Sequence, residues 1–310
     1  MKDENFISKE KEPHSRRHRV ILDKYPEIKN LYGYDYRTKY FVGIVLMIQL
    51  FTCSMAVHLD WCSLFILTYI LSGTCNNFLS LVIHECCHHL LFQKKKWNEY
   101  FSILANIPIG VPMAISFKKY HLEHHYYMGD FKKDADIPTE MEQNIFRGIF
   151  GKTMFLICNP ILYGLRPFLK NPKPFEKLEI INIMIQFLVN YIVYDWYGVK
   201  ALFYLLGGTF LGMGLHPLAA HFISEHYVSK EIQETYSYYG NLNYLTLNVG
   251  YHNEHHDFPK VSGLRLPFVR EIAKEYYDFP IKSYDSWCRL IFDFIFDPKM
   301  TVQSRIQRKL

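Results

Sequence analysis

Apolar and polar residues alternate in long blocks along the 310-residue chain. Residues 1–39 are polar and basic, whereas residues 40–57 are apolar throughout, long enough to cross a hydrocarbon core of about 30 Å. A second apolar run covers residues 62–83, after a turn too short for anything but an antiparallel return. These two runs therefore predict a transmembrane hairpin.

A second hairpin is predicted with arms at residues 178–197 and 201–222. Glycines in its second arm would permit close helix packing. The apolar segment at 100–117 contains Pro108, Gly110 and Pro112, which break a straight spanning helix, so we expect it to lie in the interface or to re-enter the membrane. The segment at 150–169 is mixed and contains two prolines, and an interfacial position is favoured for it. The predicted fold is all-α and integral to the membrane, with four spanning helices, interfacial helices and a histidine-rich cytosolic cap.

The charge pattern predicts which side of the membrane the polar segments occupy. Two hairpins return the chain to its starting side, so both termini are expected on one face. Ten Lys or Arg residues precede Tyr40, and only Lys200 lies in a hairpin turn, which marks that face as cytosolic. We expect a cytosolic amphipathic segment over 1–39 and one membrane domain over 40–310. No basic module interleaved with aromatic residues accompanies these charges, so nucleic-acid binding is not predicted.

Three histidine clusters are predicted to lie on the cytosolic face. Their spacings are H-x-x-x-H, H-x-x-H-H and H-x-x-H-H, and residues three or four apart share one face of a helix. Imidazole suits iron, copper or zinc, whereas magnesium and calcium prefer oxygen. These histidines outnumber the ligands of one ion, so a two-metal site is predicted; two irons sharing eight or nine imidazoles could use oxygen to break an unactivated C–H bond. The clusters contain His84, His88, His121, His124, His125, His252, His255 and His256.

Further residues are candidates for a ninth ligand or for supporting the site. His216, His221 and His226 recur at five-residue intervals, and His226 is favoured because it lies nearest the predicted membrane surface. His89 and His221 remain possible additional ligands, whereas isolated histidines such as His14 are expected to be ordinary surface residues. Neighbouring carboxylates could accept the second ring N–H of each imidazole. These are Glu85, Glu123, Asp134, Asp136, Glu225, Glu254 and Asp257.

One motif suggests a different enzyme. Residues 84–88 satisfy H-E-x-x-H, in which two histidines bind zinc and the glutamate acts as a general base. At the end of a membrane helix this would indicate an intramembrane zinc metalloprotease. Such a protease needs only one further ligand and would leave two triple-histidine clusters unused, so we favour the two-metal interpretation.

The three clusters resemble the histidine boxes of the membrane fatty acid desaturase and hydroxylase superfamily. Within it, the chain closely resembles the sphingolipid Δ4-desaturases, also called dihydroceramide desaturases. The matching stretches are RRHRVILDKYPEIKNL at 16–31, NIPIGVPMAISFKKY at 106–120, residues 171–174, GLHPLAAHFISEHY at 214–227 and ETYSYYGNLNYLTLNVGYHNEHHDFP at 234–259. The resemblance covers nearly the whole chain.

This resemblance implies a non-haem di-iron enzyme of the endoplasmic reticulum membrane that uses O2 and makes ceramide from dihydroceramide by desaturation at C4–C5. Electrons would come from NAD(P)H through cytochrome b5 reductase and cytochrome b5. The chain has no haem-binding His-Pro-Gly-Gly, so that donor would be a separate protein. A sphingolipid C4-hydroxylase, or an enzyme with both activities, is the main alternative. The eight cluster histidines are the implied ligands, with His226 as the ninth.

Overall fold

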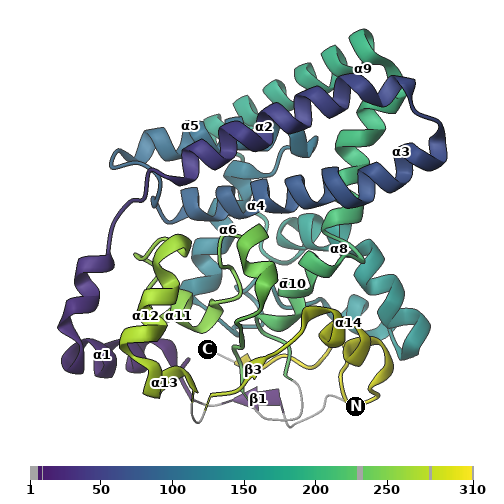
Figure 1. Cartoon of the computed structure of the whole chain (residues 1–310). Helices are drawn as coiled ribbons and strands as arrows, with labels where there is room; N and C mark the ends of the chain where they lie inside the picture. Colours follow the sequence, from purple (N-terminus) through teal and green to yellow (C-terminus); the bar gives the residue numbers. More distant parts are fainter. Residues whose placement is uncertain (1–5, 9, 229–232, 279–280, 309–310) are drawn as a thin grey trace.

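The computed structural model describes residues 6–8, 10–228, 233–278 and 281–308, and it is predominantly helical (Figure 1). Residues 1–5 and 9 of the predicted N-terminal segment lie outside this description. The principal helices are α1 (His14–Lys24), α2 (Thr38–Met55), α3 (Trp61–Leu67), α4 (Gly73–Cys87), α5 (Lys95–Asn106), α6 (Ala114–Tyr126), α7 (Glu140–Ile145), α8 (Gly148–Lys170) and α9 (Lys177–Gly212). Shorter helices follow: α10 (His221–Ser224), α11 (His252–Asp257), α12 (Leu266–Ile272), α13 (Lys274–Asp278) and α14 (Trp287–Phe296).

Short 3-10 or π segments extend or join these helices. They are η2 (Pro26–Leu31), η3 (Ala56–His58), η4 (Thr68–Ser72), η5 (Ile107–Ile109), η6 (Pro217–Ala220), η7 (Asn241–Leu245) and η8 (Gly263–Arg265). The described strands have two residues each. β1 (Ile7–Ser8) pairs in parallel with β4 (Gln307–Arg308), and β2 (Ser237–Tyr238) pairs in parallel with β3 (Ser283–Tyr284).

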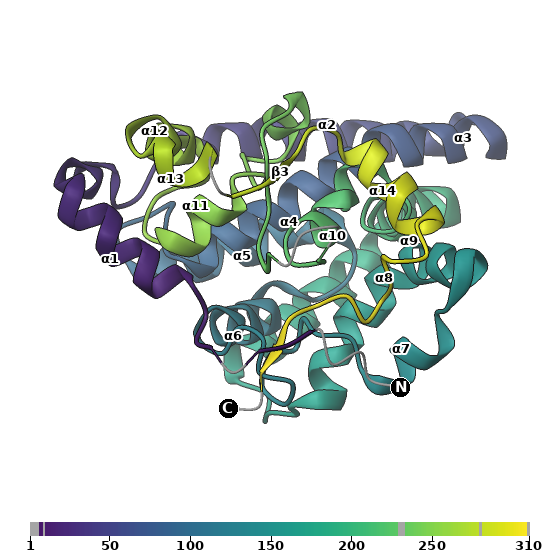
Figure 2. The same cartoon turned by 90° about the horizontal axis from the view of Figure 1, so that it is seen from below.

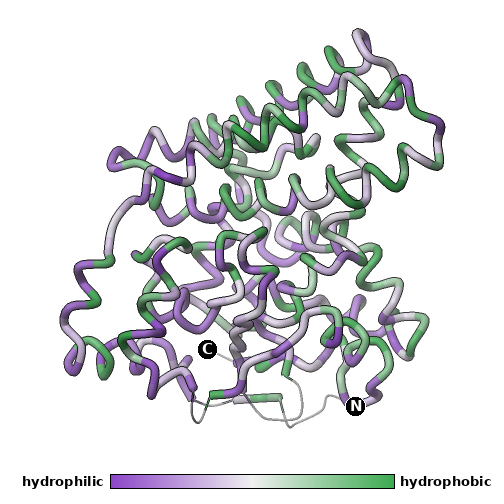
Figure 3. Tube along the Cα trace, in the orientation of Figure 1, coloured by the Kyte–Doolittle hydropathy of each residue, from purple (hydrophilic) through white to green (hydrophobic). Residues whose placement is uncertain are grey.

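Among the described residues, four helical segments are long and apolar enough to cross a membrane: Thr38–His58, Trp61–Cys87, Gly148–Lys170 and Lys177–Ser224. The α2 segment exposes many of its large apolar side chains; Met47 and Phe51 are 65% and 68% exposed, as expected for residues that face lipid. Hydrophobic residues dominate α2, α3 and the distal part of α9, whereas the opposite end of the molecule is more polar (Figure 3). The predicted all-α, integral-membrane fold is confirmed.

The first hairpin turns at Asp60, whose carboxylate accepts hydrogen bonds from the backbone N–H groups of Cys62 and Ser63 and so caps α3. In the second hairpin, α9 is interrupted at Gly198 (φ 74°, ψ −173°), within the turn expected there. This left-handed φ favours glycine because it has no Cβ.

The second arm of α9 ends at Gly212 instead of continuing to about Phe222 as predicted. Gly214 and Pro217 follow, and Pro217 begins the 3-10 segment η6. A proline at that position lacks the backbone N–H that a continuing helix would need. Because α9 ends at Gly212, the chain can turn before it reaches His226.

Glycines bring the two hairpins into close contact. A Cβ added to Gly212 would lie 2.4 Å from the carbonyl oxygen of Gly73, and one added to Gly208 would lie 2.0 Å from the hydroxyl oxygen of Ser72. Both contacts fall at the junction of η4 and α4. The predicted close packing through small residues is therefore present.

The segment between the hairpins is sharply bent. The chain bends by 114° between α5, which η5 extends, and α6. Gly110 lies at this bend and has φ 80°. The side-chain oxygen of Asn106 accepts hydrogen bonds from the N–H groups of Met113 and Ala114, which stabilises the corner. This corner directs α6, with the second histidine cluster, toward the end of α4.

α8 is a continuous 23-residue helix despite Pro160 and Pro167. Its Arg166 forms a buried ion pair with Glu142, and its Lys152 donates hydrogen bonds to the carbonyl groups of Asp297 and Met300. These contacts with polar segments of the chain support an interfacial position for α8, which stays a prediction.

A cap formed by α1 and α11 to α14 with the two strand pairs covers one end of the helices (Figures 1 and 2). Its core contains Ile21 and Ile28 from the N-terminal segment and Phe258, Val261 and Val269 from the C-terminal part. The β1–β4 pair brings the ends of the described chain side by side (Figure 2). Two regions more than 200 residues apart thus form one layer over the histidine clusters.

Candidate metal centre

The histidine clusters converge between the spanning helices and the cap. His84 and His88 lie at the end of α4, and the second cluster occupies the last turns of α6. α11 carries the third cluster, and His226 follows α10. All of these imidazoles are buried or half-buried.

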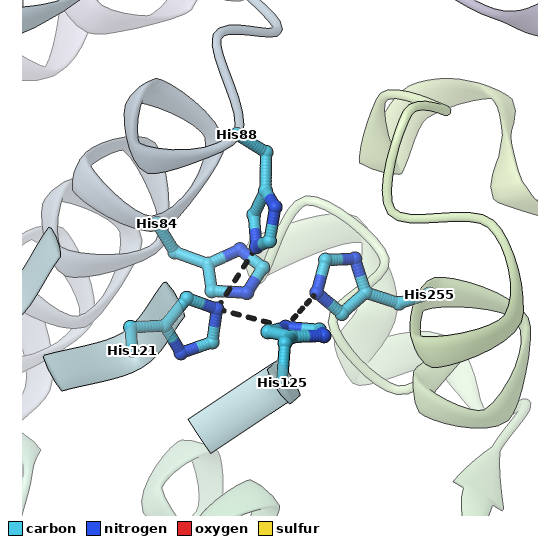
Figure 4. A group of neighbouring side chains, drawn as sticks. All are labelled: His84, His88, His121, His125 and His255. Carbon is cyan, nitrogen blue, oxygen red and sulfur yellow. Dashed lines mark hydrogen bonds between the residues drawn. The ribbon is translucent and has the colours of Figure 1, made fainter. Parts of the chain in front are cut away.

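Five of them form a first group, whose ring nitrogens lie within 4.8 Å of one another (Figure 4). Its members are His84, His88, His121, His125 and His255. His121 Nε2 lies 2.9 Å from His88 Nε2 and 3.1 Å from His125 Nε2. His255 Nε2 lies 3.1 Å from His125 Nε2, so nitrogens from three separate helices share one space.

The remaining four imidazoles form a second group. Ring nitrogens of His124, His226 and His256 lie within 4.8 Å of one another. His252 Nε2 joins them at 3.1 Å from His226 Nε2 and 3.0 Å from His256 Nε2. The two groups adjoin, because the rings of His125 and His256 stack with their centroids 4.2 Å apart.

Helical geometry explains how the residues divide. Side chains four residues apart lie on one face, and the pairs His84/His88, His121/His125 and His252/His256 each remain within one group. Adjacent residues are about 100° apart around a helix, so His124-His125 and His255-His256 each supply one imidazole to each group. The H-x-x-H-H spacing is therefore suited to two neighbouring sites.

The orientation of the rings fits bound cations. His124 Nδ1 lies 3.0 Å from the Asp134 carboxylate, and His226 Nδ1 lies 3.2 Å from the Glu234 carbonyl oxygen. A neutral ring that donates from Nδ1 presents a lone pair at Nε2. The Nε2 atoms of these two rings are 3.0 Å apart, where two lone pairs cannot hydrogen-bond with each other but can bind a cation between them.

At His124 the carboxylates of Asp134 and Asp136 outweigh the effect of burial and raise the pKa to about 9. At His226 and His252, burial favours the neutral form that can bind a metal. Burial holds the pKa of His226 and that of His252 well below the usual range, since a charged ring is poorly solvated there. Burial alone would raise the pKa of Asp134, but His124 and backbone hydrogen bonds outweigh it and lower that pKa. Neutral nitrogen donors supported by a carboxylate are typical of transition-metal sites.

The carboxylates differ in whether they contact a cluster histidine. Asp134 binds His124 as expected, and Glu225 lies 3.8 Å from His252 Nδ1 while accepting a hydrogen bond from His221 at 2.7 Å. Glu254 instead accepts hydrogen bonds from Ser237 and Tyr239. The structure thus places Glu254 in a link between α11 and the strand region, away from the imidazole nitrogens.

Three further carboxylates have partners outside the two histidine groups. Asp257 binds His14 and Arg17 of α1. Glu85 accepts hydrogen bonds from Ser262 and from the backbone N–H of Gly263, which attaches α4 to the cap. Glu123 forms an ion pair with Lys173. Because Glu85 is buried in these contacts, it is poorly placed to act as the general base that the H-E-x-x-H interpretation requires.

The other candidate histidines lie outside both groups. His89 has φ 60° and belongs to neither described group. His221 binds Glu225, and His216 accepts a hydrogen bond from the Leu218 N–H. Among the candidates that recur at five-residue intervals, His226 is the one that joins a described group.

His14 was expected to be a surface residue, and the structure shows that this was wrong. Its ring is buried, with Nδ1 2.8 Å from the Asp257 carboxylate and Nε2 2.9 Å from the Thr235 hydroxyl. The ring centroid lies 4.8 Å from that of His256. No spacing signal marks a lone histidine, so only the fold could reveal this contact.

An apolar cavity of about 370 Å³ reaches the first group at His121. α6, α8 and α9 form most of its wall, including Phe117, Phe168 and Phe210. On the cap side, a cavity of about 580 Å³ borders His125 and His256 and is lined by charged residues such as Arg19 and Lys260. The centre can thus be reached from an apolar side and from a polar side.

Two family models and several relatives match this chain. A family model described as fatty acid desaturase matches residues 60–287, and one described as sphingolipid Delta4-desaturase matches residues 4–37. The chain is 46% identical to the sphingolipid delta(4)-desaturase DES1 of Xenopus tropicalis, over 96% of this chain and 93% of that protein. It is 47% identical to the protein of the same name from Drosophila melanogaster, with the same coverage of both chains, and 46% identical to that from Mus musculus, over 96% and 92%.

Proposed function

Because the chain belongs to the fatty acid desaturase family, we propose that it is a sphingolipid Δ4-desaturase that converts dihydroceramide to ceramide. The similarity to delta(4)-desaturases over nearly the full length of both chains carries this proposal. It agrees with a histidine-lined centre beside an apolar cavity. The enzyme is therefore an oxidoreductase that acts on a membrane lipid.

The family uses non-haem iron, and the two histidine groups can bind metal. We propose His84, His88, His121, His125 and His255 as ligands of one iron and His124, His226, His252 and His256 as ligands of the other. Bound iron would supply the activation of O2 needed to cleave an unactivated C–H bond. The protein residues hold the imidazoles in place: Asp134 orients His124, and the Glu234 carbonyl orients His226.

The reaction must balance in atoms and electrons. One hydrogen leaves C4 and one leaves C5, and a C4–C5 double bond forms. The two electrons and two protons lost by the lipid, two electrons from an external donor and two protons from solvent reduce O2 to two molecules of water. We propose cytochrome b5, reduced by its reductase with NAD(P)H, as that donor, and the endoplasmic reticulum membrane as the location.

The apolar cavity is suited to hold the alkyl chain of the lipid. Its aromatic and aliphatic wall excludes water from the substrate beside His121. The charged cavity beside Arg19 and Lys260 would be a poor site for an alkyl chain, because the charged groups would lose hydration. We therefore place the substrate between α6, α8 and α9.

Membranes that contain the protein, supplied with labelled dihydroceramide, NADH, cytochrome b5, its reductase and air, test this function. Mass spectrometry should show a product lighter by two hydrogens, with the double bond at C4–C5. Gain of one oxygen at C4 would instead identify a hydroxylase. Unchanged lipid, with an active electron supply and an iron-loaded protein, would contradict both.

A further inference from the structure

A polar pair interrupts the apolar wall of the cavity close to the metal centre. Asp136 and Tyr163 both line this cavity, and the Tyr163 hydroxyl donates a hydrogen bond of 2.9 Å to Asp136 Oδ1. Tyr163 comes from α8, whereas Asp136 lies in the segment between α6 and α7. Asp136 carries the one carboxylate among the described residues of this largely apolar wall, and it suggests a specific polar partner, since burying an unpaired charge is costly.

The pair lies beside the second histidine group. Asp136 Oδ2 is 3.7 Å from His124 Nδ1, the nitrogen that hydrogen-bonds to Asp134. One imidazole ring therefore separates Asp136 from the Nε2 atom that faces His226. A lipid group bound by Asp136 would lie within a few bonds of the carbon presented to the metal centre.

The contacts of Asp136 leave room for a donor. Tyr163 occupies Oδ1, whereas the 3.7 Å distance between Oδ2 and His124 Nδ1 is too long for a hydrogen bond. The Asp136 side chain retains 15% exposure, and the residue lines the cavity. A hydroxyl group on a ligand is a suitable donor to such an oxygen.

The proposed substrate carries a hydroxyl group next to the carbons that are oxidised. Its sphingoid base has a C3 hydroxyl directly adjacent to C4, and its long alkyl chain begins beyond C5. With the chain in the apolar cavity, this hydroxyl is the polar group closest to the reacting carbons. It would lie against the part of the wall that contains Asp136 and Tyr163.

On the premise of the proposed function, we infer that Asp136, oriented by Tyr163, binds the C3 hydroxyl of the sphingoid base and so selects C4 and C5 for oxidation. Asp136 is thus a substrate-binding and specificity-determining residue, and Tyr163 is a positioning residue. A bond to an ionised acceptor is also directional, which restricts how far the alkyl chain can slide along the cavity. Without this bond, neighbouring carbons could take the place of C4.

Binding to the iron-free protein tests this inference without relying on turnover. The affinities of wild type and Asp136→Asn are measured for dihydroceramide and for its 3-deoxy analogue, for example by native mass spectrometry. Removing either the carboxylate charge or the hydroxyl should weaken binding roughly 10- to 100-fold, the usual range for a hydrogen bond to a charged group. Removing both the charge and the hydroxyl should weaken binding little more than removing one of them. Equal losses for both lipids in Asp136→Asn would overturn the inference.

Tyr163→Phe provides a second variant that leaves the carboxylate and His124 in place. It should weaken binding of dihydroceramide several-fold, have a smaller effect on the 3-deoxy analogue, and retain wild-type iron content. The same exchange at the 77%-exposed Tyr126 on α6 is the matched control and should change neither affinity. If Tyr163→Phe binds both lipids as the wild type does, Tyr163 has no positioning role.

Product analysis separates this inference from the proposed function. Wild-type desaturation at C4–C5 tests the function itself, whereas Tyr163→Phe tests the selection of carbons. The iron-loaded variant should form a larger share of products oxidised at other positions or hydroxylated at C4. A wild-type product distribution in a variant with weakened binding would contradict the role of this pair in selecting the carbons.

Discussion

At the scale of single residues, the direction of each imidazole decides whether a histidine belongs to the centre. His88 and His89 are adjacent, but only His88 directs Nε2 toward His121, at 2.9 Å. His89 adopts a left-handed backbone conformation and joins neither described group. Neighbouring histidines in one cluster therefore have different expected roles.

We predict that His88→Ala will lose iron, because it removes one of five nitrogens from the first group. Iron per protein, measured by plasma mass spectrometry, should fall by about one half or more, and desaturation should stop. His89→Asn is the matched control, since asparagine tolerates a positive φ better than most residues. It should keep wild-type iron content; a loss equal to that of His88→Ala would contradict the placement of His89.

At the scale of elements, the buried carboxylate of Asp257 links α11 to α1, beside hydrogen bonds from Arg17 to the Asn253 side chain and from His18 to the Asp257 carbonyl oxygen. Arg17 Nε lies 2.5 Å from Asp257 Oδ2, the Tyr277 hydroxyl donates to the same oxygen, and His14 binds Oδ1. Burial would raise the pKa of Asp257, but Arg17 and His14 outweigh it, and the pKa lies below the usual range. Because Asp257 follows His256 directly, this contact connects the N-terminal segment to the third histidine cluster.

We predict that Arg17→Ala will destabilise the cap by about 3 kcal/mol, the lower range for removing one partner of a buried ion pair. The melting temperature of the detergent-solubilised protein should fall, and limited proteolysis should cut near α1 sooner. Arg16→Ala, at the exposed neighbouring position, is the control and should stay within about 0.5 kcal/mol of wild type. Equal behaviour of the two variants would show that α1 is not held through Asp257.

At the scale of the whole molecule, the cap with α11 lies at one end of the spanning helices, and the turn between α2 and α3 lies at the other (Figure 1). This polarity follows from the hairpins, each of which returns the chain to its starting end. The basic residues that precede α2 support our proposal that the cap faces the cytosol. An electron donor on that side would reach the centre without crossing the membrane.

We predict that a membrane-impermeant maleimide will distinguish the two ends in sealed microsomes. Exposed Cys62, beside the Asp60 turn, should react only after permeabilisation. A cysteine introduced as Lys132→Cys, in the exposed segment after α6, should react at once, in a Cys288→Ser background that removes the other exposed thiol. The reverse pattern would place the cap in the lumen.

Much of the centre was predictable because it depends on local geometry. Apolar runs long enough to cross a bilayer predicted the spanning segments, and a helix places residues four apart on one face whatever surrounds it. The spacing within each cluster predicted imidazoles that share a helix face, and the number of histidines in the three clusters predicted more than one metal ion. Pro108 and Gly110 likewise predicted the break between α5 and α6, because their backbone preferences act locally.

The division into groups of five and four required the tertiary structure. It depends on how α4, α6 and α11 meet, and contacts such as His124 with His226 join residues 102 positions apart. The same applies to Glu85, which binds the cap instead of an imidazole, and to His14, which is buried against Asp257. The sequence by itself determined which residues share a helix face, because helical periodicity is local. Only the packing of distant segments decided which faces meet, because that depends on the burial and hydrogen bonding of the whole chain.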